Sequence, residues 1–320
     1  MKLSDIRKLS GYFAYGESAA TQQQVRDHLK SLGYDPDGFY QELEMSSPWV
    51  DTHRDTSYSN GQLQLHSHSF YELLYCRSSC GAEYLVGAER YRLQRGDIIF
   101  VPPGISHRPL LPQNMTEPYK RYVLWLSPEF MERFAQLLAP QQPEQVAYST
   151  MLRTAGTPWE SLGEMFRQGV QEAEGQKPGW EAAVIGNTIV LLTRLGRAIR
   201  EAPASMLTAE TPELLDQVLA YVEGNLSGKI SLADTARKFF VSESAISQTF
   251  RKKMGVSFYR CVTQRRLIAA KTLLLEGVSG AEVAARVGFQ DYSTFYRAFR
   301  QEYGIPPRQF RKMQELAEPI

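Results

Sequence analysis

Four side chains with metal-binding or proton-transferring chemistry gather in two short stretches of the first half of the chain. His66 and His68 are two residues apart, and Glu72 follows four residues after His68. Alternate residues of a strand point to the same face, so the two histidines would share a face. The second stretch, "GDIIFVPPGISH", ends at His107. Together these side chains would form a four-ligand nitrogen and oxygen site for a divalent metal ion.

The surrounding sequence predicts the strands that would position these side chains. Between about residues 57 and 125, short runs rich in Tyr, Val, Ile and Leu alternate with turn residues, as in antiparallel strands. The segment "VGAE" predicts a hairpin turn, and "RGD" predicts another. A small β-barrel or jelly roll is the expected product of such strands.

The two histidine-containing stretches resemble the two sequence motifs of cupins. The second match is the closer one and includes Gly96, Gly104 and His107. The first motif departs from the family, because Gly61 lies one residue too near His66. The resemblance implies a cupin-like barrel with the histidines at its mouth.

The cupin resemblance leaves two interpretations of this set open. In metal-binding cupins such residues are metal ligands, which here would be His66, His68, Glu72 and His107. In sensor domains a similar set lines or supports a pocket for a small molecule, and Tyr84 and Arg108 would join the four as ligand-binding residues. The second interpretation requires no cofactor and treats a divalent metal as an additional occupant.

The last third of the chain predicts two helix-turn-helix units joined by one long helix. Ser231, Ser242 and Ser279 each precede a helical segment with a side chain that can cap the first turn, and Asp291 precedes a fourth. Gly288 marks the tight turn of the second unit. This pattern is typical of a DNA-binding domain.

Positive charge is concentrated in the same region. Residues 229–312 contain 16 Lys and Arg against 6 Asp and Glu, a net charge of +10, whereas the whole 320-residue chain carries +1. A phosphate-binding module requires such a local excess of basic residues. The overall composition, with 43% hydrophobic and 22% charged residues, is that of an ordinary globular protein.

The C-terminal region resembles the DNA-binding domain of the AraC/XylS family of bacterial transcription regulators. The resemblance is carried by "RRLIAAKTLLL", "VAARVGFQDYSTFYRAFRQEYG" and "PPRQFRK". Two positions depart from it: Thr235 stands where the family usually has Leu, and Phe240 occupies the turn before Ser242. The resemblance implies two recognition helices that enter successive major grooves of promoter DNA, roughly 34 Å apart.

The outward positions of these two helices are the expected DNA contacts by family resemblance. The expected base-reading residues are Ser244, Ser247, Gln248, Tyr292, Ser293, Tyr296 and Arg297. The expected phosphate contacts are Arg251, Lys252 and Arg300. Glutamine can pair with adenine and arginine with guanine, whereas lysine and arginine at helix ends hold phosphates.

The flanking segments complete the predicted organisation, an α+β fold with a cupin-like jelly roll, flanking helices and an all-α domain. The domains are a helical arm (1–45), a sensor and dimerisation domain (46–200), a linker (201–211) and the DNA-binding domain (212–320). Ser127 with Pro128, and Thr157 with Pro158, predict helix starts. The apolar stripe of "WEAAVIGNTIVLLTRLGRAIRE" fits either packing on the barrel or a dimer interface.

The sequence also favours a cytoplasmic location. The first residues, "MKLSDIRKLSG", lack the apolar core of a signal peptide, and the apolar segment "AAVIGNTIVLL" is too short and interrupted to span a membrane. Cys76, Cys80 and Cys261 have no zinc-finger spacing and are expected to be reduced thiols.

These observations predict a one-component transcription regulator rather than an enzyme. Its expected partners are promoter DNA, a small-molecule effector, a second copy of the chain and RNA polymerase, with no membrane partner. Carbohydrate is the effector class that the family resemblance implies. The alternatives are a metal-dependent cupin enzyme fused to a DNA-binding domain, and a constitutive DNA-binding protein whose barrel only dimerises the chain.

Overall fold

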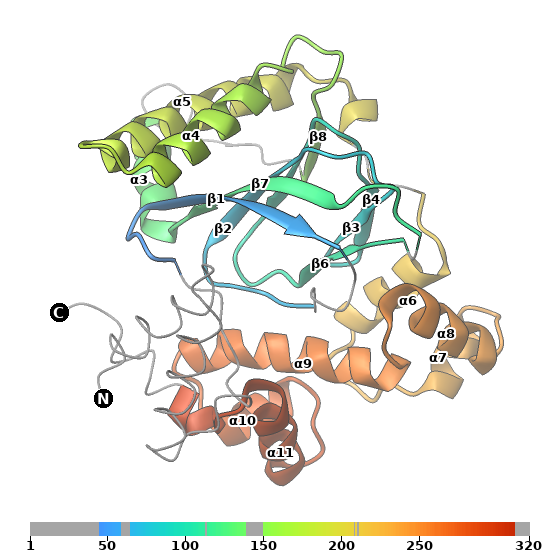
Figure 1. The fold of residues 1–320 in the computed structure, drawn as a ribbon. Helices are drawn as coiled ribbons and strands as arrows, with labels where there is room; N and C mark the ends of the chain where they lie inside the picture. Colours follow the sequence, from blue (N-terminus) through green and yellow to red (C-terminus); the bar gives the residue numbers. More distant parts are fainter. Residues whose placement is uncertain are drawn as a thin grey trace, which may run out of the picture. The chain divides into compact units, whose positions relative to one another are not determined.

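A computed structural model of the chain describes residues 45–58, 65–112, 114–138, 150–207, 209 and 211–310 (Figure 1). The chain forms two compact units, which are described separately. One contains residues 44–224 and 230–261, and the other contains residues 225–229 and the chain from residue 262. The predicted N-terminal arm lies outside the described residues except for Met45.

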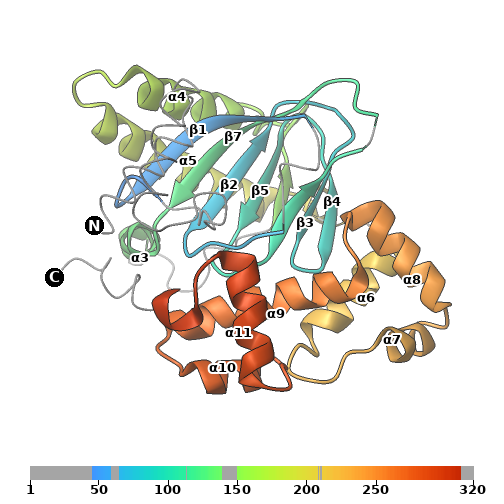
Figure 2. The ribbon, with the colours of Figure 1, turned by 60° about the horizontal axis from the view of Figure 1, so that its bottom comes forward.

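The barrel consists of two antiparallel sheets that enclose one core. The five-stranded sheet has the order β1 (Val50–Ser57), β7 (Tyr119–Leu126), β2 (Tyr71–Cys76), β5 (Asp97–Val101) and β8 (Met151–Arg153). The three-stranded sheet has the order β4 (Glu89–Arg92), β3 (Glu83–Val86) and β6 (His107–Leu110). Figure 2 shows β1, β7, β2 and β5 side by side in the large sheet, with β3 and β4 of the small sheet beyond them. The predicted β-rich N-terminal domain is confirmed.

Strand β7 shows how the sequence separates two cores. Val123 and Trp125 pack into the core between the sheets, whereas Tyr122 and Leu124 pack into a second core on the other face of the large sheet. This alternation follows from the two-residue period of a strand. Because both faces of β7 are covered, the strand is apolar along much of its length.

Three helices belong to the second core: α3 (Pro128–Leu138), α4 (Leu162–Gly175) and α5 (Trp180–Glu201). Figure 1 shows α4 and α5 lying across the large sheet. The predicted apolar stripe of α5 packs here through Val184, Leu191, Leu192, Leu195 and Ile199. The helix is longer than the apolar segment expected from the sequence, and by length and composition it could cross a membrane, but these residues pack in the second core, against the large sheet.

Local expectations were wrong at four places. Strand β1 begins at Val50, before the predicted β region, and β8 lies where only helix was expected. The "RGD" turn joins β4 to β5, which belong to different sheets, so it does not form a hairpin. Helix α4 begins at Leu162, because Thr157 caps only a short turn by accepting a hydrogen bond from the Trp159 N–H at 3.2 Å.

The helix-turn-helix units form as predicted. The first comprises α7 (Leu232–Lys238), α8 (Glu243–Thr249) and a π-helical continuation, η3 (Phe250–Met254). It is preceded by α6 (Leu214–Glu223) and by a short 3-10 helix at Ala204–Met206. The second comprises α10 (Gly280–Arg286) and α11 (Tyr292–Tyr303), which share a core with the long helix α9 (Phe258–Leu275) (Figure 2).

Candidate ligand pocket and nucleic-acid interface

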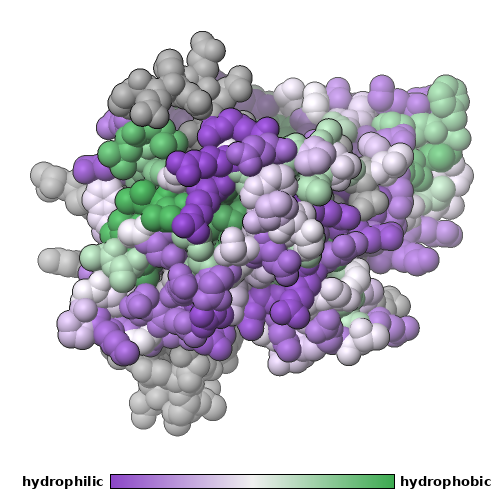
Figure 3. Space-filling view, turned by 90° about the horizontal axis from the view of Figure 1, so that it is seen from above, coloured by the Kyte–Doolittle hydropathy of each residue, from purple (hydrophilic) through white to green (hydrophobic). Residues whose placement is uncertain are grey.

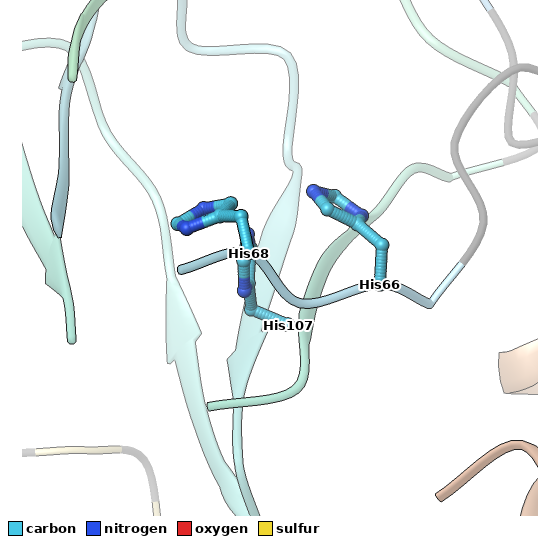
Figure 4. A group of neighbouring side chains, drawn as sticks. All are labelled: His66, His68 and His107. Carbon is cyan, nitrogen blue, oxygen red and sulfur yellow. The ribbon is translucent and has the colours of Figure 1, made fainter. Parts of the chain in front are cut away.

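The three predicted histidines of the barrel meet where the segment before β2 pairs with β6. The N–H of His66 donates to the carbonyl of His107 at 3.2 Å, and the N–H of His107 donates back to the carbonyl of His66 at 2.9 Å. Ring nitrogens of His66, His68 and His107 lie within 4.8 Å of one another. Figure 4 shows the three rings beside one another.

The backbone fixes the tautomers of two of these rings. The Nδ1 atom of His68 lies 2.8 Å from the carbonyl oxygen of Phe70, and Nδ1 of His107 lies 2.8 Å from that of Ile105. A carbonyl oxygen can only accept, so both Nδ1 atoms carry the proton. In a neutral imidazole the Nε2 atom is then an acceptor with a free lone pair.

Glu72 completes a cluster of acceptors. Its Oε2 atom lies 3.3 Å from Nε2 of His107 and 3.8 Å from Nε2 of His68, and its Oε1 atom accepts a hydrogen bond from Trp125 Nε1 at 2.8 Å. The facing Oε2 and Nε2 atoms are buried and have no hydrogen-bond partner among the described residues. Buried polar atoms are nearly always paired, so these atoms are available to a cation, to a ligand that donates hydrogen bonds, or to a further proton on a ring nitrogen.

The charge of the cluster depends on burial and on which ring nitrogens carry a proton. Burial lowers the pKa of the His68 imidazole, which therefore favours its neutral form. Burial alone would raise the pKa of Glu72, but hydrogen bonds from His107 and His68, which these rings donate when Nε2 carries a proton, hold that pKa well below its usual range. The cluster thus combines an anionic carboxylate with a His68 imidazole that favours its neutral form.

The other two predicted pocket residues lie on opposite sides of the sheet. Tyr84 is buried with its ring 6.3 Å from that of His107, and burial, followed by the charge of Glu72, raises the pKa of its phenol. The Tyr84 hydroxyl therefore stays protonated and can donate a hydrogen bond to a ligand. The structure does not bring Arg108 to the histidines, since its Nη1 atom donates to the carbonyl oxygen of Met254 at 3.1 Å.

Strand β7 contributes polar residues that were absent from the sequence-based site. Besides Trp125, Arg121 is buried and donates to Asp55 Oδ2 at 2.6 Å, and its guanidinium lies 5.0 Å from the centre of the Tyr119 ring. The buried Tyr119 hydroxyl has no hydrogen-bond partner among the described residues. The alternation in "YKRYVLWL" places Tyr119, Arg121 and Trp125 on one face of the strand. This alternation is the sequence signal that could have identified them as site residues.

The ten predicted DNA contacts all remain accessible. Eight are exposed: Ser244, Gln248, Arg251, Lys252, Tyr292, Ser293, Arg297 and Arg300. The other two, Ser247 and Tyr296, are half-buried. The opposite faces of the recognition helices are buried through Ile246 in α8 and through Phe295 and Phe299 in α11. Each helix therefore presents a polar or basic face to a partner.

The starts of the recognition helices are fixed by side-chain caps. Ser242 accepts a hydrogen bond from the N–H of Ala245 at 3.1 Å, and Asp291 accepts one from the N–H of Thr294 at 2.7 Å. The Thr294 hydrogen bonds hold the pKa of Asp291 below its usual range. Such caps orient the first turns of these helices, where base-reading side chains usually stand.

Comparison with known proteins finds two families on this chain. Residues 53–183 match the family described as an AraC-like ligand binding domain. Residues 235–313 match a helix-turn-helix domain family. The first match covers most of the barrel with α3 and α4 and ends at the start of α5, and the second covers the C-terminal helices from within α7 onward.

Two relatives align with most of this chain, and one solved structure aligns with part of it. The transcriptional activator RhaS of Citrobacter koseri is 26% identical over 77% of this chain and 87% of its own length. The transcriptional activator RhaR of Yersinia pestis is 27% identical over 77% of this chain and 84% of its own. Among solved structures, the C-terminal domain of the response regulator yesN from Fusobacterium nucleatum is 30% identical, covers 30% of this chain and 95% of its own, and has a TM-score of 0.29.

Proposed function

Because this chain belongs to the AraC family of transcription regulators, we propose that it controls promoters in response to a small molecule bound in its barrel. It binds DNA sequence-specifically through its two helix-turn-helix units. The observation that carries this function is the pair of capped recognition helices, each with a buried apolar face and an accessible polar face. The relatives are named activators, and we propose the same sense of regulation here.

The proposed roles at DNA follow from side-chain chemistry. Gln248 on α8 can pair with adenine, and Arg297 on α11 can pair with guanine, both in the major groove. Arg251 and Lys252 at the end of the first recognition helix would hold phosphates, as would Arg300 in the second. The first two residues would set sequence preference and the others mainly affinity.

We propose a ligand rich in hydroxyl groups as the effector. The pocket offers three facing acceptors, on Glu72, His68 and His107, and the Tyr84 phenol as a donor. Hydroxyl groups donate and accept hydrogen bonds, so a carbohydrate can satisfy both kinds of group at once. Trp125 beside the carboxylate adds an apolar surface of the kind common in ligand pockets.

A divalent metal ion is the second proposed occupant, because the same acceptors are suitable ligands. His68, His107 and Glu72 would each supply one atom, and His66 would supply a fourth. The hydrogen bonds from Nδ1 to backbone carbonyls are the kind that orient metal-binding histidines. A bound metal would supply positive charge to the cluster. We place the chain among regulators rather than enzymes, since its relatives are activators.

We further propose a cytoplasmic homodimer that contacts RNA polymerase. The buried side of α5 is already used by the barrel core, so pairing would use its other side, where Ala182, Gly186 and Val190 are exposed at four-residue intervals. Figure 3 views the molecule from above Figure 1 and shows apolar side chains gathered toward its left side, bordered by polar ones. Val190→Glu should convert a dimer to a monomer in light scattering, whereas an unchanged mass would remove α5 as the interface.

The occupant of the pocket can be identified by a thermal-shift screen of the full chain against sugars, sugar acids, aromatic acids and divalent metals, with and without chelator. A sugar that raises the melting temperature in the presence of chelator supports the hydroxyl-rich effector. A shift with metal alone, reversed by chelator, supports the metal site. If no compound shifts the transition, the barrel is not a sensor for these classes.

Glu72→Gln is the variant that tests the acceptor cluster itself. The amide oxygen can still accept from Trp125, while the new amide N–H can donate to the Nε2 atom of His107. We expect the free barrel to become more stable by about 1 kcal/mol, because an unpaired acceptor gains a donor. The same variant should lose the thermal shift of the effector or metal. A destabilised barrel that still binds would contradict this description of the pocket.

A further inference from the structure

The outer face of the three-stranded sheet is buried although it carries charge. Arg90 on β4 and Arg108 on β6 both pair in register with Leu85 on β3, so the three residues lie in one row. All three are buried, yet they point away from the core between the sheets, to which their neighbours Tyr84 and Val86 belong. The segments that cover this row lie in the same compact unit as the barrel, which also contains α6 and residues 230–261.

Arg90 is enclosed by three carboxylates. Its Nη1 atom donates to Glu83 at 2.6 Å, its Nε atom donates to both oxygens of Asp216 at 3.2 Å, and its Nη2 atom lies 3.0 Å from Glu213. Glu83 belongs to β3, whereas Glu213 and Asp216 form the N-terminal capping box of α6. Burial opposes the charge on Arg90, but Asp216, Glu83 and Glu213 outweigh it and raise the pKa of the guanidinium. The first turn of α6 is therefore held by a buried positive charge of the barrel.

The same contacts reach the end of the first recognition helix. Glu213 also pairs with Lys253, and Arg108 donates to the carbonyl oxygen of Met254 at 3.1 Å. Lys253 and Met254 are the last residues of η3, where helix carbonyls that lack a partner within the helix attract positive groups. At the other end of α6, Ser106 donates to Glu223 Oε1 at 3.2 Å. Helix α6 and the first helix-turn-helix unit are thus attached to the barrel at several points.

We propose that Arg90, Arg108, Glu213 and Asp216 form an autoinhibitory latch that restrains the first helix-turn-helix unit on the sensor barrel. Strand β6 connects the latch to the pocket, because His107 and the next residue, Arg108, face opposite sides of the same strand. The latch also occupies Lys253, which would otherwise be available to a DNA phosphate. Its regulatory role rests on the proposed function, whereas the restraint itself does not.

Amide hydrogen exchange of the full chain tests the restraint without DNA or effector. In Arg90→Gln, amides of α6 and η3 should exchange at least tenfold faster than in the wild type, while those of β2 stay unchanged. Arg92→Gln is the matched control, since Arg92 is an exposed residue of the same strand. Unchanged exchange in α6 of a folded Arg90→Gln protein would overturn the latch.

Glu213→Gln provides a second variant that removes less buried charge. The Glu213 side chain is 52% exposed, so its neutralisation should leave the fold intact even if Arg90→Gln fails to fold. Freed from Glu213, Lys253 should add one phosphate contact, which steepens the slope of log affinity against log salt by about 0.9 on random duplex DNA. An unchanged slope together with unchanged exchange in α6 would reject the latch. Failure of the wild type to bind any DNA would instead reject the proposed function.

Discussion

The two helix-turn-helix units share one turn but stabilise it differently. In the first unit Val241 donates to the carbonyl of Ala236 at 3.0 Å, and in the second Phe289 donates to that of Ala284 at 2.9 Å. The residue before each donor has a positive φ, 55° at Phe240 and 85° at Gly288. The two turns therefore share one backbone conformation, with an aromatic residue at the positive-φ position in the first unit and glycine in the second.

The second turn requires glycine, whereas the first does not. A Cβ atom at Gly288 would lie 2.2 Å from the carbonyl oxygen of Leu226, which is backbone and cannot easily move aside. Phe240 is 96% exposed and accepts the strain of its left-handed conformation without such a neighbour. The comparison indicates that close packing against residues 226 and 227 fixes the second turn, whereas the exposed first turn tolerates a large side chain.

The largest effect is expected from Gly288→Ala. The new methyl group meets the backbone at residues 226 and 227 and adds the cost of a positive φ, so we predict a loss of about 2 to 4 kcal/mol in the second unit. Faster amide exchange in α10 and α11 would measure it. Gly277→Ala is the matched control, since Gly277 has φ +82° and open space around it. Equal losses in the two variants would show that packing does not require Gly288.

Substitution of the two proposed base-reading residues compares how much each helix-turn-helix unit contributes to sequence-specific DNA binding. Arg297→Ala and Gln248→Ala should each cost about 1 to 3 kcal/mol on a cognate site and relax the preference at one base. Competition binding with cognate and random duplexes measures both. If either variant loses the same binding free energy on the cognate and the random duplex, that residue contacts a phosphate instead of a base.

A smaller effect is expected from the phosphate contacts. Lys252→Ala in the first unit and Arg300→Ala in the second should each weaken binding to cognate and random DNA by the same factor. Each should also reduce the slope of log affinity against log salt concentration by about 0.9. Titrations at several salt concentrations give the slope. A loss confined to the cognate duplex would instead make that residue a base reader.

The smallest effect is expected from Phe240→Gly. Relief of the left-handed strain is offset by the greater freedom of glycine in the unfolded chain, so the stability of the first unit should change by about 0.5 kcal/mol or less. Exchange of α7 and α8 amides measures it. A loss of more than about 2 kcal/mol would mean that the exposed ring supports the turn.

The sequence predicted best where the signal is local. The caps Ser231, Ser242, Ser279 and Asp291 lie within three residues of the N–H groups that they accept from, so their spacing alone reveals the helix starts. The unusual Thr235 is also explained locally, because its buried hydroxyl donates to the carbonyl of Ser231 at 2.7 Å. These signals were sufficient for the DNA-binding fold.

Features that depend on contacts between residues far apart in the sequence could not be predicted from local patterns. Strand β8 is three residues long and exists through its pairing with β5. The histidines were found because their spacing is distinctive, but Arg108 was grouped with them although strand alternation places it opposite His107. The partner of Arg90 at residue 216 is remote in sequence, and no local pattern connects the two.

The most direct test of the proposed function is selection of binding sites from a random pool of duplex DNA with the purified full chain. We predict two separate blocks of enriched sequence, one for each helix-turn-helix unit. Gln248→Ala should reduce the information in one block and Arg297→Ala in the other. No enrichment, or enrichment that neither variant alters, would contradict sequence-specific recognition by these two helices.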